Sequence, residues 1–131
     1  MIVVDANVVA YLYLPSEHSA RAEALLERDP DWAAPVPWRS EFRNILAEYL
    51  RREAISFEQA VSLQREAEDL LAGAEFDVES RAVLELVRES GCSACDCEFV
   101  ALAKHLRVRL VTMDTKVLKA FPEVAWALAA L

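Results

Sequence analysis

Two short apolar runs, each followed by an aspartate, constrain the fold of this chain most strongly. Ile2–Val4 precedes Asp5, and the run at 109–113 precedes Asp114. Both runs are dominated by β-branched and aliphatic residues without a regular polar–apolar alternation, which is typical of parallel strands buried on both faces. We therefore expect a parallel sheet in which two strands end at an aspartate.

Segments with helical periodicity separate the predicted strands. Six helices are expected, at roughly 6–14, 18–28, 38–52, 56–71, 79–90 and 94–106. Three shorter strand candidates lie near 33–36, 75–77 and 124–126. Strands that alternate with helices over the whole length predict one domain, residues 1–131, with an α/β fold. Its expected architecture is a three-layer α/β/α sandwich around a mostly parallel central sheet.

Glycine content and hydropathy exclude several classes of protein. The two glycines, Gly73 and Gly91, do not follow a hydrophobic run, so the glycine-rich phosphate loops of dinucleotide-binding and P-loop folds are excluded. The longest apolar stretch, Ile2–Leu14, contains Asp5 and Asn7 and is too short to span a bilayer. We therefore expect a cytoplasmic protein that does not associate with membranes.

The charge balance and the cysteines narrow the possibilities further. The chain has 14 Lys and Arg residues against 22 Asp and Glu, a formal net charge of −8. This acidity argues against a protein that holds nucleic acid by charge alone, but not against an enzyme that reaches phosphate through bound cations. The clustered Cys92, Cys95 and Cys97 cannot make an even disulfide framework and lack a second zinc-ligand pair. We expect them to be small buried hydrophobes.

Four acidic residues occupy positions that should converge. Asp5 and Asp114 end predicted strands, at the sheet edge where open α/β folds bind ligands. Glu41 and Asp96 lie in the first turns of two predicted helices, which start from that edge; Glu98 faces another side of its helix. Each acid alone also fits a helix cap or the helix dipole. Together, four carboxylates in one crevice would repel unless a cation neutralised them, and oxygen ligands favour Mg²⁺ or Mn²⁺.

Four motifs resemble those of PIN domains, in the family's order and at its usual separations. They are Val3–Val9, Ser40–Asn44, Asp96–Ala103 and Leu110–Asp114. The resemblance covers nearly the whole chain and is closest to the VapC-type toxins of bacterial and archaeal toxin–antitoxin modules. It implies a PIN-like fold and metal-dependent cleavage of RNA.

The resemblance also implies roles for individual residues. The activity would be that of a Mg²⁺- or Mn²⁺-dependent endoribonuclease. Its metal ligands, which are also its catalytic residues, would be four acids: Asp5, Glu41, Asp96 and Asp114. Thr112 shares a strand face with Asp114, so its hydroxyl is expected to orient that carboxylate or the attacking water.

Substrate and partner contacts are expected around these motifs. Polar and basic residues expected to contact the RNA are Asn7, Arg39, Arg43, Thr115 and Lys116, with Lys119 just beyond. The resemblance further implies a homodimer and a cognate antitoxin that lies across the acidic crevice. The predicted helices within 38–71 have apolar residues on more than one side, which fits an interface.

Two other functions fit part of the sequence. An aspartate-based phosphoryl-transfer enzyme, similar to haloacid-dehalogenase-like phosphatases or response-regulator receivers, also has an acid after its first strand, as Asp5 is here. Such phosphatases have an Asp two residues later, where this chain has Asn7. The other alternative is a catalytically silent PIN-like binding module, although all four acids are present. Catalysis by a Ser–His–Asp or Cys–His set is poorly supported, because His18 and His105 lie away from the predicted edge.

Overall fold

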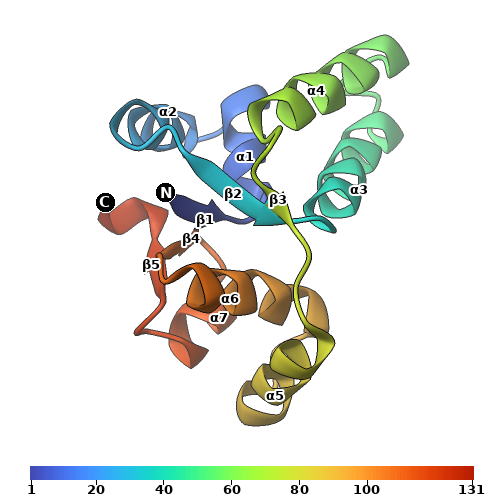
Figure 1. Ribbon diagram of the computed structural model, residues 1–131. Helices are drawn as coiled ribbons and strands as arrows, with labels where there is room; N and C mark the ends of the chain where they lie inside the picture. Colours follow the sequence, from blue (N-terminus) through green and yellow to red (C-terminus); the bar gives the residue numbers. More distant parts are fainter.

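A five-stranded parallel sheet forms the centre of the computed structural model, which describes residues 1–131 (Figure 1). The strands are β1 (Ile2–Val4), β2 (Trp32–Pro35), β3 (Glu75–Phe76), β4 (Leu110–Thr112) and β5 (Ala125–Ala127). Their order across the sheet is β3-β2-β1-β4-β5, and all four neighbouring pairs are parallel. The two strands that precede Asp5 and Asp114 are therefore direct neighbours.

Helices cover both faces of the sheet. They are α1 (Ala6–Tyr13), α2 (Ser19–Arg28), α3 (Trp38–Arg51), α4 (Phe57–Leu70), α5 (Ser80–Ser90), α6 (Ala94–Leu106) and α7 (Thr115–Ala120). Helices α1 to α4 lie on one side, and α5, α6 and α7 lie on the other (Figure 1). Helix α6 packs on the central strands, and α5 packs on α6. The predicted α/β/α sandwich is confirmed.

Burial of the central strands explains their uninterrupted apolar sequence. All residues of β1 and β4 are buried, and Thr112 is the one buried polar residue in the chain. Helix α6 adds a continuous buried run from Phe99 to Ala103. Cys92 and Cys97 are buried free thiols, as expected, whereas Cys95 is exposed, so the prediction for that cysteine is wrong. No helix is long and apolar enough to cross a membrane.

Two elements near the C-terminus were not expected from the sequence. Helix α7 and the 3₁₀ turn Leu128–Ala130 are six and three residues long, too short to show a helical period. A local cap starts α7: the Asp114 carboxylate accepts hydrogen bonds from the backbone N–H groups of Lys116 (2.9 Å) and Val117 (3.3 Å). Asp114 therefore lies just after β4 and caps the start of α7.

Candidate functional site

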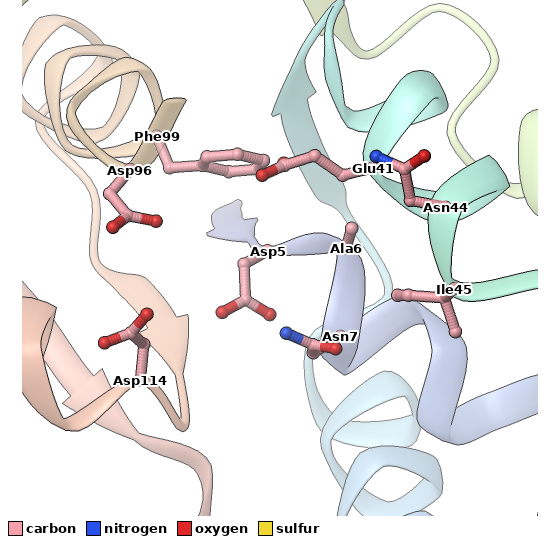
Figure 2. A pocket seen from close by; sticks show the side chains of 9 residues that line it. All are labelled: Asp5, Ala6, Asn7, Glu41, Asn44, Ile45, Asp96, Phe99 and Asp114. Atoms are coloured by element: carbon pink, nitrogen blue, oxygen red, sulfur yellow. The ribbon is translucent and has the colours of Figure 1, made fainter. Parts of the chain in front are cut away.

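The four predicted acids line one cavity of about 260 Å³ at the carboxyl edge of the sheet (Figure 2). Asp5 follows β1 and Asp114 lies two residues after β4, so the two adjacent strands bring them together. Glu41 and Asp96 lie in the first turns of α3 and α6, on opposite sides of the sheet. Acids from both helical layers thus meet over the end of the central strands.

Asp5 is held by two hydrogen bonds from different parts of the chain. Its Oδ1 accepts from the backbone N–H of Val8 at 2.9 Å, which caps α1, and its Oδ2 accepts from the Thr112 hydroxyl. The Thr112 Oγ1 in turn accepts from the backbone N–H of Asp114 at 3.0 Å. The buried threonine therefore fixes the relative positions of the two strand-end acids.

The electrostatic environment of Asp5 disfavours its charged form. Burial raises its pKa to about 6, and repulsion from Asp114 and Asp96 adds to the rise. The hydrogen bonds from Thr112 and Val8 act in the opposite direction and lower it. Without a cation, a carboxyl group that would be ionised in water retains a proton at mildly acidic pH.

Glu41 is perturbed in the same direction from the other side of the cavity. Burial raises its pKa to about 7, with further repulsion from Asp5, Asp96 and Glu98. Two acids with raised pKa values in one cavity mark a place that would gain stability by binding positive charge.

The donor atoms at this edge suit a hard cation. The four acids offer carboxylate oxygens only, and the Asn7 amide also lines the cavity. The acids do not form a ready-made cage, because no three His, Cys, Asp or Glu side chains surround one point at coordinating distance. Oxygen donors with no nearby imidazole favour Mg²⁺ or Mn²⁺ over zinc, so the residue types fit such an ion.

The structure separates the residues predicted to contact substrate into two groups. Asn7 lines the cavity, and the exposed Thr115 and Lys116 lie in the first turn of α7, directly after Asp114. Arg39 and Arg43 do not line the cavity.

The two arginines contact carboxylates outside the cavity. The Arg39 guanidinium donates to Glu75 and Glu68 on the side of α3 that faces β3 and α4. Arg43 is 58% exposed and lies 3.9 Å from Glu68.

Two residues near the cavity were not placed there from the sequence. Asn44 lines the cavity one turn after Glu41, and the i, i+3 spacing is the signal that would have identified it. Glu98 lies close enough to raise the pKa of Glu41, and its Oε2 is buried with no hydrogen-bond partner. Its position two residues after Asp96 suggested a different direction, because residues two apart on a helix do not share a face.

Comparison with known proteins assigns the family. The PIN domain family model matches residues 2–126. The chain belongs to the PIN domain family. Ribonuclease VapC3 from Pyrobaculum aerophilum is 25% identical over 124 residues, which cover 92% of this chain and 95% of that protein. The family resemblance of the four sequence motifs is thereby confirmed.

Solved structures share the fold of this PIN domain. The crystal structure of FitAcB from Neisseria gonorrhoeae matches with a TM-score of 0.78 at 19% identity, covering 100% of both chains. A toxin–antitoxin complex from Klebsiella pneumoniae matches with a TM-score of 0.72 at 18% identity, covering 98% of each chain. These matches span the whole sandwich and both helical layers.

Proposed function

We propose that this PIN domain protein is a metal-dependent endoribonuclease and the toxin of a toxin–antitoxin module. The observation that carries the proposal is the single cavity in which four acids meet from two strand ends and two helix starts. Support comes from the relative named as a ribonuclease, which spans almost the whole chain, and from the neighbour described as a toxin–antitoxin complex.

The proposed ligands of Mg²⁺ or Mn²⁺ are the four acids of the cavity: Asp5, Glu41, Asp96 and Asp114. When bound, such an ion activates water and offsets charge on the attacking and leaving oxygens of a phosphodiester. Thr112 holds the Asp5 carboxylate in place through its hydroxyl and so keeps one ligand oriented.

The remaining polar residues are proposed to position the RNA. The Asn7 amide lines the cavity and is placed to hydrogen-bond a phosphate or ribose oxygen. Thr115 and Lys116 lie exposed directly after Asp114. The ammonium group of Lys116 forms no ion pair within the chain and is available to a phosphate. Arg43, which is largely exposed, remains a candidate for contact with a more distant phosphate. The guanidinium of Arg39 is already hydrogen-bonded to Glu68 and Glu75 and is not proposed to contact RNA.

The protein partners of the proposal are a cognate antitoxin and a second copy of the chain. An apolar groove between α3 and α4, lined in part by Leu46, Leu50 and Val61, offers a surface for either. Phe57, at the start of α4, is 68% exposed. Apolar surface of this kind is common at interfaces. Light scattering tests the homodimer, and copurification with the antitoxin tests the complex.

The structure favours hydrolysis through bound cations over an aspartyl-phosphate mechanism. Four carboxylates line the cavity, which suits a bound cation, and Asn7 stands where such phosphatases have their second aspartate. The experiment is RNA cleavage with Mg²⁺ or Mn²⁺, with and without excess chelator. We expect internal cuts that the chelator abolishes. Cleavage unaffected by chelator, or an acid-stable phosphoryl group on the protein, would contradict the proposal.

A further inference from the structure

A second polar cluster lies behind the acidic cavity, where β3 meets the first turn of α3. The Glu75 carboxylate accepts from the Nε1 of Trp38 at 2.7 Å and from the Nε and Nη2 of Arg39, also at 2.7 Å each. Trp38 is fully buried, and the Glu75 side chain is 15% exposed. Three donors on one part-buried carboxylate make this a rigid contact, and hydrogen bonding from Arg39 lowers the pKa of Glu75.

The donors of this contact are the first two residues of α3. Trp38 and Arg39 begin the helix, and Glu41 follows within the same turn, with its backbone N–H bonded to the carbonyl of Pro37 at 3.3 Å. Fixing the side chains of residues 38 and 39 on the edge strand therefore fixes the turn that carries Glu41. A one-ångström shift of that turn would displace a candidate ligand.

Electrostatic repulsion opposes the position of Glu41 at the cavity. Glu41 projects toward Asp5 and Asp96, and like charges in a half-buried cavity repel. Repulsion acts to push the start of α3 away from the sheet edge. Glu75 attaches the same turn to β3, whose residues pair with β2 in the main sheet. Neither Glu75 nor Arg39 lines the cavity, and Arg39 lies two residues before Glu41, so the two side chains do not share a face of α3.

We propose that Glu75 is a positioning residue, which fixes the first turn of α3 through Trp38 and Arg39 and thereby holds Glu41 at the acidic cavity. The effect of Glu75 on metal binding rests on the proposed function, whereas its anchoring of the turn does not depend on a metal. Arg39 then serves to connect strand and helix, in place of the substrate contact expected from the sequence.

The test uses Glu75→Gln, which keeps the side-chain volume and removes the charge that holds Arg39. Glu68→Gln is the matched control, since it removes the other carboxylate on Arg39 but leaves the contact to β3. Amide hydrogen exchange at residues 39–41, measured without metal, reports on the turn itself. Mn²⁺ binding by calorimetry, in the wild-type and Glu41→Gln backgrounds, reports on the ligand. Arg39→Lys, which cannot form the bidentate contact, is a second variant should Glu75→Gln fold poorly.

We expect Glu75→Gln and Arg39→Lys to accelerate exchange at residues 39–41 at least fivefold, and the control to leave it unchanged. Mn²⁺ affinity should fall about tenfold in the wild-type background, which is the usual effect of losing a residue that orients a metal ligand. It should not fall further in the Glu41→Gln background, because Glu75 acts only through Glu41.

Three results would overturn or separate the claims. Unchanged exchange in both variants overturns the positioning role, whatever the metal data show. An equal, additive loss of Mn²⁺ affinity in the Glu41→Gln background also overturns it. If exchange is faster in the variants but the wild-type protein binds no Mn²⁺, the anchoring role is supported and the proposed metal-dependent function is contradicted.

Discussion

The hydroxyl of Thr112 donates to the carboxylate of Asp5, which lies at the end of the neighbouring strand. The same oxygen accepts from the backbone N–H of Asp114. One buried side chain therefore connects two of the four acids and sets the geometry of the central part of the cavity. Its loss should affect both stability and ligand placement.

Thr112→Val keeps the shape of the side chain and removes its hydrogen bonds. The Asp114 N–H then loses its partner, and the free energy of unfolding should fall by about 1–3 kcal/mol. Mn²⁺ affinity should fall about tenfold, because Asp5 loses a group that orients it. Chemical denaturation and calorimetry measure the two effects. Thr112→Ser, which retains the hydroxyl, should stay close to wild type; equal losses in both variants would argue for a packing effect alone.

The stability of the metal-free protein should depend on pH through Asp5. Its pKa rises from 3.8 in the unfolded chain to about 6 in the fold, so between these values the folded state binds more protons than the unfolded state. The contribution of Asp5 to the free energy of unfolding therefore falls as pH rises from about 4 to about 6, by on the order of 2 kcal/mol. Glu41 extends the decline toward pH 7.

Denaturation of wild type and Asp5→Asn across pH 4–8 tests this dependence. The asparagine variant cannot ionise, so it should gain stability relative to wild type as the pH rises. A difference between the two proteins that stays constant across this range would show that Asp5 is not perturbed.

Mn²⁺ should stabilise the protein against heat. A ligand that binds only the folded form at one hundred times its dissociation constant adds about 2.7 kcal/mol. For a domain of this size, that corresponds to a rise in Tm of roughly 10 °C. Differential scanning calorimetry should show the rise for wild type and for the exposed-acid control Glu89→Gln, but not for Asp5→Ala. A similar rise for Asp5→Ala would contradict a shared site.

A cognate antitoxin should compete with the metal. The chain carries a net charge of −8, and its four cavity acids favour a basic segment across the sheet edge. We expect the affinity of the antitoxin, measured by calorimetry at constant ionic strength, to fall as Mn²⁺ is raised. If the affinity is the same at all Mn²⁺ concentrations, the antitoxin binds away from the cavity.

The position of the four acids was predictable because strand ends and helix starts share one edge in a parallel sheet. Asp5 and Asp114 end runs whose sequence already indicates buried parallel strands. Glu41 and Asp96 each lie in the first turn of a helix that starts at the same edge. Two of the four acids are also helix caps, since Asp5 caps α1 and Asp114 caps α7.

The environment of individual charges was not predictable, because it depends on contacts between distant segments. Arg39 lies near Glu41 in sequence, but Glu75 and Glu68, from two other elements, determine where its guanidinium lies. Helix α7 depends on a single cap and has no periodic pattern of its own. Glu98 on α6 raises the pKa of Glu41 on α3, a relationship between distant segments that no local spacing reveals.

Mn²⁺-dependent RNA cleavage by Asp96→Asn tests the central claim most directly. The amide keeps the volume of the side chain and removes the ligand charge, so the fold should persist by circular dichroism. We predict that cleavage falls by at least a hundredfold in Asp96→Asn, while Glu89→Gln, an exposed acid on α5, cleaves at the wild-type rate. Cleavage by folded Asp96→Asn at the wild-type rate, in Mg²⁺ or Mn²⁺, would contradict the assignment of the cavity as the nuclease site.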